Sequence, residues 1–265
     1  GIALSMIGAA LGYKIVIVMP DTMSEERRRI VKAYGAELIL TEGKLGMAGA
    51  VAKSEELAKA HDYFLIRQFE NAANLLSHEE TTAVEILHDL SGEVDAFVAG
   101  VGTGGTISGV GKVLKAHHSN VLNVAVQPAK SPVLTGGTPA GHGIQGIGAN
   151  FIPGIYDKDI VDEVLDMDEE TAYAAARELG KKAGLLVGMS SGGNFAAAKV
   201  IAKKLGKGKK VVTVLRIEKR SGNKNIVGSI IFFSGCQSTF LLSIGALLLP
   251  TAAILFCAFF DASWS

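Results

Sequence analysis

The densest cluster of potential ligand-binding groups is a glycine-rich turn, GVGTGGT, at residues 100–106. It follows an apolar run, Asp95–Val101, and precedes a helical pattern, Ile107–His118. A turn from a strand into a helix directs free backbone N–H groups and the positive end of the helix dipole toward one point. Glycines allow close approach of an anion there, and two threonines add hydroxyl donors. This pattern predicts a phosphate-binding loop over Gly102–Thr106.

Neighbouring residues narrow the kind of phosphate ligand. A nucleoside triphosphate loop needs Gly-Lys-Ser/Thr, and no lysine follows the turn before Lys112. Gly100, Gly102 and Gly105 do satisfy the dinucleotide pattern G-x-G-x-x-G. A dinucleotide site also needs an acidic residue after the next strand, where this sequence has Gln127. A monophosphate cofactor and a nucleotide-binding oxidoreductase both stay open on these residues.

A second turn, Gly188-Met189-Ser190-Ser191-Gly192, has the G-x-S-x-G pattern of a hydrolase nucleophile. Hydrolases with this turn use a histidine base that comes later in the chain, whereas all six histidines here precede Ser190. This order argues against a hydrolase. The two serines are compatible with a helix cap or with a ligand contact.

Two further segments carry polar groups without specifying a chemistry. The glycine-rich segment GIQGIGANFIP, residues 143–153, has no helical or strand period, which is typical of an ordered loop. The segment Gln68-Phe69-Glu70-Asn71 follows a predicted strand and offers amides. Those amides are suited to holding a carboxylate, and a simple strand-end turn is the equal alternative.

Short β-rich runs alternate with longer helical patterns from Gly1 to Leu215. The continuous apolar strands predict an α/β fold with mostly parallel sheets that helices cover on both faces. Ligands of such sheets bind at the carboxyl ends of strands, where these turns lie. Strands are predicted at 14–19, 37–41, 63–66, 95–101, 121–126, 185–187 and 210–215, and helices at 2–11, 24–34, 46–60, 75–90, 107–118, 168–183 and 194–205.

The composition indicates a globular chain. Of 265 residues, 48% are hydrophobic and 32 are glycine, which suits an α/β protein and excludes a disordered one. Basic and acidic residues number 26 each, so net charge gives no general reason to bind nucleic acid. Cys236 and Cys257 cannot form a disulfide framework or a zinc site by themselves. We expect a cytoplasmic protein without a bound metal.

The C-terminal segment differs from the rest of the chain. From Asn225 to Ser265 the only charged side chain is Asp261, and Thr239–Phe260 is a run of 22 uncharged residues, long enough to cross a bilayer. With the basic segment Arg216–Lys224 before it, this run fits a non-catalytic membrane-tethered module. A frameshifted, non-native end is the interpretation we favour. We expect residues 216–265 to be an apolar tail outside the enzyme fold.

Taken together, these segments resemble the cysteine synthases (O-acetylserine sulfhydrylases), which are fold-type II pyridoxal-phosphate enzymes. The resemblance covers about Gly1 to Leu215 and implies a two-lobed α/β fold like that of the tryptophan synthase β-subunit. In that fold, residues 1–215 form the enzyme, with about 12–67 as a smaller mobile lobe. The segments that carry the resemblance are, in order, MPDTMSEERR, YGAELILT, QFEN, GTGGT, HGIQGIGANFIP and GLLVGMSSG.

The resemblance also implies a reaction and roles for individual residues. The cofactor would be pyridoxal 5'-phosphate, and the reaction would convert O-acetylserine and sulfide to cysteine and acetate in a homodimer. Formation of cystathionine by the same β-replacement chemistry is the nearest alternative. Ser190 would contact the pyridine nitrogen, Gln68 would help hold the substrate carboxylate, and Gln145 and Gly146 would line the cleft. The cofactor phosphate would be bound by Gly102, Thr103, Gly104, Gly105 and Thr106.

The sequence departs from the family pattern at positions that bear on catalysis. The family's Schiff-base lysine lies upstream of a T-S-G-N-T-G loop whose last glycine matches Gly1, so no lysine of this chain matches it. Ala72 stands where the family usually has proline, and the resemblance stops at Leu215. We therefore expect no catalytic lysine among these residues and no activity from them alone.

Borohydride reduction tests this expectation. After incubation with pyridoxal phosphate and reduction, the 265-residue chain should keep no cofactor on a lysine, because no residue matches the anchoring side chain. Intact-mass spectrometry measures the adduct. One stoichiometric adduct would contradict the prediction and identify a substitute lysine.

Overall fold

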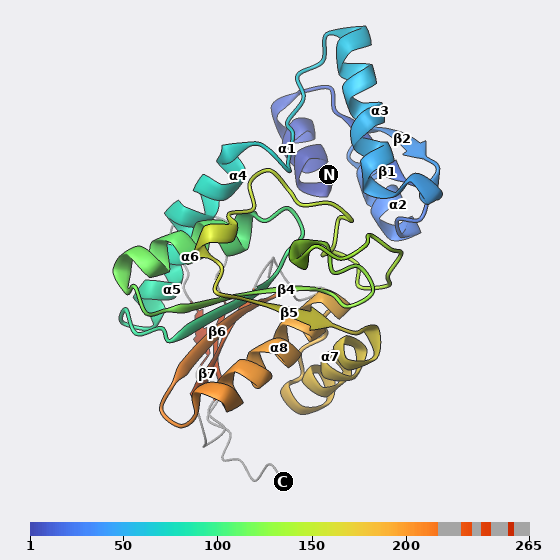
Figure 1. Cartoon of the computed structure of the whole chain (residues 1–265). Helices are drawn as coiled ribbons and strands as arrows, with labels where there is room; N and C mark the ends of the chain where they lie inside the picture. Colours follow the sequence, from blue (N-terminus) through green and yellow to red (C-terminus); the bar gives the residue numbers. More distant parts are fainter. Residues whose placement is uncertain (217–228, 235–239, 245–253, 257–265) are drawn as a thin grey trace. The chain divides into compact units, whose positions relative to one another are not determined.

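The computed structural model describes residues 1–216 throughout and, after them, the strands at 229–234, 240–244 and 254–256. The described residues form two compact units, one over Gly1–Arg67 and the other from Gln68 onward. Figure 1 shows the order of their elements along the chain. The predicted division at about residues 12–67, and the mobility of that lobe, stay predictions.

The first unit is a small α/β layer. Strands β1 and β2 pair in parallel, with Ile17 opposite Leu38. Its core is formed by Ile17, Val31 and Ala36. The elements are α1 (Ile2–Leu11), β1 (Val16–Pro20), α2 (Glu25–Ala33), β2 (Glu37–Thr41), a 3-10 turn (Gly43–Leu45) and α3 (Gly46–His61).

The second unit contains a larger sheet with the strand order β5-β4-β3-β6 in its parallel part. The register places Ala96 of β3 opposite Leu122 of β4 and Val211 of β6. Its elements are α4 (Ala72–Ser77), a π-helical turn (His78–Thr82), α5 (Ala83–Asp89), β3 (Ala96–Gly100), α6 (Gly105–His117), β4 (Leu122–Pro128), 3-10 turns at Val133–Thr135 and Lys158–Ile160, β5 (Glu163–Met167), α7 (Glu169–Ala183), α8 (Met189–Leu205) and β6 (Lys210–Leu215).

Helices cover both faces of this parallel sheet, because successive strand residues point to opposite faces. Val98 of β3 packs in one core cluster with Phe195 of α8. Phe97, its neighbour, belongs to the opposite cluster with Leu114 of α6. Figure 1 shows α5 and α6 on one side of the sheet and α7 and α8 on the other. The predicted α/β class with parallel sheets is confirmed.

The elements differ from the sequence prediction at several places. The strand predicted at 185–187 is reduced to a single bridge residue, Val187. Residues 63–66, all described, form no strand. The prediction missed β5 (Glu163–Met167), an edge strand whose charged residues interrupt its apolar ones. The helix predicted at 75–90 begins earlier, at Ala72, and contains the π-helical turn. The helix predicted from Asn194 begins at Met189, inside the GMSSG turn.

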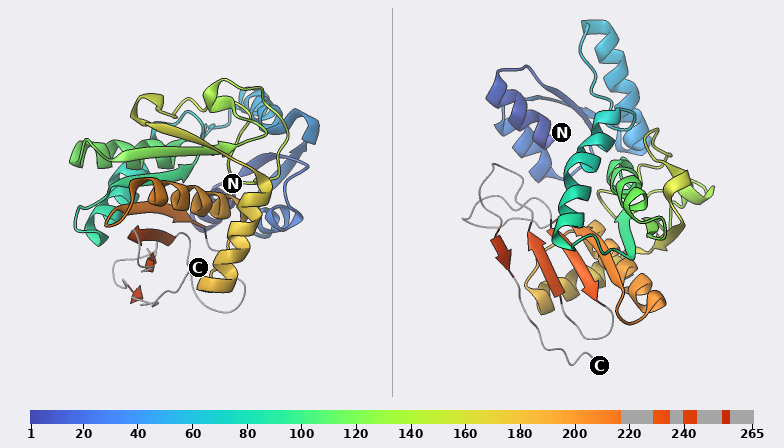
Figure 2. Two further views of the ribbon diagram at one scale, coloured as in Figure 1. Left: turned by 60° about the horizontal axis from the view of Figure 1, so that its bottom comes forward. Right: turned by 90° about the vertical axis from the view of Figure 1, so that its left-hand side faces the viewer.

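Much of the predicted apolar tail, residues 216–265, lies outside the described residues, including Cys236 and Cys257. Its described strands β7 (Ser229–Ser234), β8 (Phe240–Ile244) and β9 (Ile254–Phe256) continue the sheet from β6 in antiparallel order. The right-hand view of Figure 2 shows these strands side by side. Within the described ranges, no helix has both the length and the apolar character to cross a membrane. The placement of the tail outside the enzyme fold stays a prediction.

Ala72, the departure from the family's proline, is the first residue of α4. Asn71 before it has φ −74° and ψ 116°, the extended conformation that a residue before proline prefers. The Ala72 N–H has no acceptor among the described residues. The next N–H, of Ala73, donates to Asn71 Oδ1 at 2.9 Å. Position 72 therefore accepts proline without loss of a hydrogen bond.

We expect Ala72→Pro to raise the free energy of unfolding by about 0.4–1 kcal/mol, because proline reduces the entropy of the unfolded chain. Ala73→Pro is the matched control and should lower it, since that change removes the N–H bonded to Asn71. Urea denaturation measures both. Equal effects of the two substitutions would contradict the geometry assigned to this helix start.

Candidate active site

The loop Gly102–Thr106 lies at the carboxyl end of β3 and leads into α6, with Gly104 as the N-cap residue. The backbone N–H groups of Gly102, Thr103, Gly104 and Thr106 have no acceptor among the described residues. Free N–H groups at a helix N-terminus form an anion-binding concavity, and the helix dipole adds to the attraction. The loop therefore has the geometry of a phosphate cradle.

Close packing requires glycine at two positions of this loop. Gly104 has φ +90°, and a Cβ there would lie 3.0 Å from the Tyr156 Cα. A Cβ on Gly102 would lie 2.6 Å from the carbonyl oxygen of Gly146, which is a forbidden distance. Side chains at these positions would displace the neighbouring backbone, so the cradle keeps its shape only with glycine.

The glycine-rich loop at residues 143–148 therefore lies against the cradle. The Gly148 N–H donates to the Val101 carbonyl oxygen at 2.9 Å, which joins the two loops. Predicted cleft residues Gln145 and Gly146 are both solvent-exposed on this loop. The structure thus places them beside Gly102, while their contact with a ligand stays a prediction.

Glu169, the first residue of α7, holds the start of that loop. Its Oε1 accepts from the Gly143 N–H at 2.9 Å and from Lys130 Nζ at 2.9 Å. The hydrogen bond from Lys130, followed by that from the Gly143 amide, lowers the pKa of Glu169 below its ordinary value. The carboxylate is consequently ionised at neutral pH and keeps both bonds.

The two serines of the GMSSG turn have different surroundings. Ser191 is 2% exposed, and its Oγ accepts from the Arg216 N–H at 2.8 Å and donates to the Arg216 carbonyl at 3.4 Å. Ser190 Oγ has no hydrogen-bond partner within the described part of the chain. It lies 3.3 Å from the point that a Cβ on Gly146 would occupy. Ser191 is thus structural, and Ser190 is available to a ligand.

Asn74 of α4 joins the QFEN segment to the cradle. Its Nδ2 donates to the Gln68 carbonyl oxygen at 2.9 Å and to Thr103 Oγ1 at 2.9 Å. Gln68 itself is solvent-exposed. The structure brings Gln68 to the same strand-end region as Thr103, and its role toward a carboxylate stays a prediction. Sequence reasoning missed Asn74, which stands three residues after the QFEN motif.

Asn194 of α8 is a second residue that sequence reasoning missed. It is 7% exposed, and its Oδ1 accepts from the Gly100 N–H at 2.8 Å. Its Nδ2 donates to the Val214 carbonyl oxygen at 2.9 Å. One amide therefore ties the ends of β3 and β6 together. The available signal was an amide within the small, apolar face of the helix after GMSSG.

Gln127 stands where a dinucleotide site has an acid, and its side chain is fully engaged. It is 1% exposed, and Nε2 donates to Thr135 Oγ1 at 3.0 Å and to Asp166 Oδ1 at 2.9 Å. Its Oε1 accepts from the Leu134 N–H at 2.8 Å. The side chain is occupied in holding the loop after β4, which argues against a ribose site there.

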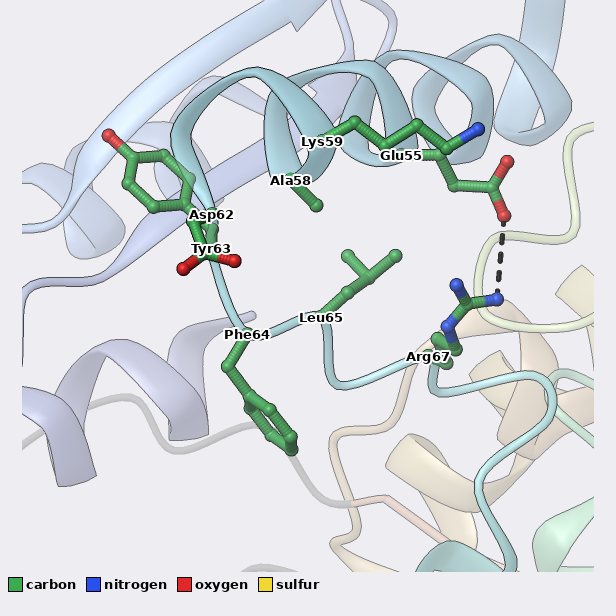
Figure 3. Close-up of a pocket in the computed structure, with 8 residues that line it drawn as sticks. All are labelled: Glu55, Ala58, Lys59, Asp62, Tyr63, Phe64, Leu65 and Arg67. Carbon is green, nitrogen blue, oxygen red and sulfur yellow. Dashed lines mark ion pairs between the residues drawn. The ribbon is translucent and has the colours of Figure 1, made fainter.

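An open depression of about 530 Å³ lies within the first unit, at the C-terminal end of α3. Figure 3 shows the ion pair at its rim, between Arg67 Nη1 and Glu55 Oε1 at 3.7 Å. Phe64, which is 88% exposed, also lines it. None of the predicted site residues lines this depression.

The structure thus brings together free N–H groups and a free hydroxyl at the carboxyl ends of parallel strands, the place where α/β proteins typically bind phosphorylated ligands. The family model for pyridoxal-phosphate dependent enzymes matches residues 1–216. The chain belongs to this family, and the predicted cofactor class is confirmed.

Individual relatives are cysteine synthases and related enzymes. The chain is 53% identical over 216 residues to the cysteine synthase of Staphylococcus aureus. The alignment covers 81% of this chain and 70% of the relative. It is 49% identical to the structure of O-acetyl serine sulfhydrylase isoform 3 from Entamoeba histolytica, with a TM-score of 0.69. That match covers 74% of this chain and 59% of the Entamoeba enzyme. The predicted resemblance to cysteine synthases is confirmed.

Another similar structure is a hydrogen sulfide-producing enzyme from Fusobacterium nucleatum, at 46% identity and a TM-score of 0.76. The match covers 79% of this chain and 72% of that enzyme. The relatives therefore share the fold as well as the sequence. The chain spans only part of the length of these relatives.

The different surroundings of the two serines give a test of stability. We expect Ser191→Ala to lower the free energy of unfolding by about 1 kcal/mol, because it removes a hydrogen bond at a buried position. Ser190→Ala, the matched control, should leave stability unchanged. Thermal unfolding of the two variants measures the difference. A larger loss for Ser190→Ala would overturn this division of roles.

Proposed function

We propose that residues 1–216 bind pyridoxal phosphate, and that the protein carrying them performs the cysteine synthase reaction, O-acetylserine and sulfide to cysteine and acetate. The observation that carries this proposal is the set of four unpaired backbone N–H groups in Gly102–Thr106. They stand at the N-terminus of α6, in a family that uses this cofactor.

The residues present fit the phosphate of this cofactor. The free N–H groups of Gly102–Thr106 would bind its oxygens, and the dipole of α6 would add roughly 0.3–1 kcal/mol. Thr103 Oγ1 accepts a hydrogen bond from Asn74, so its own proton is available for donation to the phosphate. The fit depends on glycine at position 104, where any Cβ would meet Tyr156.

Ser190 would hold the pyridine nitrogen, as the resemblance implies. Pyridoxal phosphate, when bound, supplies an electron sink for replacement at the substrate's β-carbon. A serine hydroxyl hydrogen-bonds the ring nitrogen without protonating it. An aspartate, in contrast, would keep that nitrogen protonated. The unprotonated ring is a weaker sink, which suits elimination of a good leaving group such as acetate.

The remaining assignments follow from the same resemblance. We propose that Gln68 helps to hold the carboxylate of a small amino-acid substrate, since the residue is exposed and Asn74 joins its backbone carbonyl to Thr103. Gln145 and Gly146 would line the cleft beside Ser190. We further propose a homodimer in the cytoplasm, to be tested by light scattering and cell fractionation. Cystathionine formation and an oxidoreductase are not favoured.

The cradle gives a direct test of cofactor binding. We expect Gly104→Val to abolish binding of pyridoxal phosphate, because a side chain there meets Tyr156 and the positive φ is strained. Fluorescence titration measures the affinity. Gly141→Ala is the control, since a Cβ at Gly141 meets nothing within 4 Å. Unchanged affinity in a folded Gly104→Val variant would sink the assignment.

A further inference from the structure

The π-helical turn between α4 and α5 places His78 in contact with Thr106 of the cradle. In this turn the Ala83 N–H donates to the His78 carbonyl oxygen, one residue beyond the α-helical partner. Such turns are rare and occur frequently at functional sites. Figure 1 shows α4 and α5 beside α6, which begins in the cradle. The irregular turn therefore stands next to the proposed phosphate site.

The imidazole of His78 bridges two threonine hydroxyls. Its Nε2 lies 3.1 Å from Thr106 Oγ1, and its Nδ1 lies 2.9 Å from Thr82 Oγ1. Each hydroxyl has His78 as its only hydrogen-bond partner within the described residues. The neighbouring carboxylate of Glu79 is held by Lys112 Nζ at 2.8 Å, in an ion pair of its own. His78 therefore links Thr82 to the last residue of the cradle.

The ring is neutral in this setting. Burial disfavours the charged imidazolium and lowers the pKa of His78 from its ordinary value. A neutral imidazole has one N–H donor and one acceptor nitrogen, so the two hydroxyls must play opposite roles toward it. Two arrangements satisfy the distances, and they differ in where the Thr106 proton points.

A bound phosphate distinguishes these arrangements. If Nδ1 carried the proton, Thr106 would donate its hydrogen to Nε2 and would have none for the ligand. If Nε2 carries the proton, Thr106 accepts from His78, and its own O–H is available for donation to a phosphate oxygen. Thr82 then donates to Nδ1, which stabilises this tautomer. The hydrogen bonds would run in one direction, from Thr82 through His78 and Thr106 to the phosphate.

We propose that His78 and Thr82 are positioning residues that orient the Thr106 hydroxyl toward the phosphate of the bound ligand. The inference rests on the proposed phosphate site and assigns it two residues outside the glycine-rich loop. Because it concerns proton positions in a chain of hydrogen bonds, it can be tested by spectroscopy and binding without any measurement of activity.

The first measurement is the tautomer of His78 in the full chain, by nitrogen-15 NMR of labelled histidine with saturating inorganic phosphate. Assignment uses His78→Gln. The expected result is protonation at Nε2 and a bare Nδ1. Protonation at Nδ1, or at both nitrogens, would overturn the relay, because Thr82 would then have no part in orienting Thr106.

The second measurement compares phosphate and pyridoxal phosphate affinities of threonine variants. Loss of one oriented hydrogen bond predicts that Thr82→Val weakens both affinities by about 3- to 10-fold. Thr82→Ser should restore them. Thr81→Val is the matched control, because Thr81 Oγ1 donates to the Ser77 carbonyl at 2.6 Å and does not contact His78.

The outcomes separate the inference from the proposed function. If the unmodified chain binds phosphate tightly and Thr82→Val and Thr81→Val bind it with equal affinity, the proposed orientation of Thr106 through His78 and Thr82 is overturned. The proposed phosphate site itself is then unaffected. Absence of binding by the unmodified chain would overturn the proposed function, and the relay with it. Should Thr82→Val fail to fold, the tautomer measurement on the unmodified chain still decides.

Discussion

The site depends on how the ends of β3 and β6 are held together where their pairing stops. Their parallel pairing runs from Ala96 opposite Val211 to Val98 opposite Thr213 and ends there. Beyond it, Asn194 accepts from the Gly100 N–H and donates to the Val214 carbonyl, two half-buried backbone groups at the strand ends. The amide bridges the gap between the strand ends and fixes α8, which carries Ser190, relative to the start of the glycine-rich turn.

The loops of the site were predictable from sequence because their signals are local. Glycines and hydroxyls within five to seven residues indicate a turn into a helix wherever the rest of the chain lies. The residues that assemble these loops carry no such signal. Asn194 acts on Gly100, which is 94 positions away, and Asn74 acts on Thr103, 29 positions away. Sequence spacing does not encode these contacts, and β5 escaped prediction because an edge strand needs no continuous apolar run.

The glycines of the cradle serve packing as well as the proposed binding of phosphate. Phosphate recognition alone requires free N–H groups, which other residues also have. Gly102 approaches the carbonyl of Gly146, and Gly104 approaches the backbone of Tyr156. The glycines of this motif therefore reflect the close packing of three chain segments as much as an affinity for anions. GTGGT also restricts the backbones packed against it, at Gly146 of GIQGIG and at Tyr156.

The proposed phosphate site presents neutral hydrogen-bond donors to a doubly charged phosphate, in place of a cationic side chain. Residues 102–106 include no lysine or arginine, and Lys112, the first lysine after them, is paired with Glu79. Burial keeps His78 uncharged by lowering its pKa. In the proposed site, attraction for phosphate would then come from backbone N–H groups, two threonine hydroxyls and the helix dipole. Because each donor contributes little alone, the orientation of every hydroxyl matters more here than in a loop that uses a lysine as a point charge.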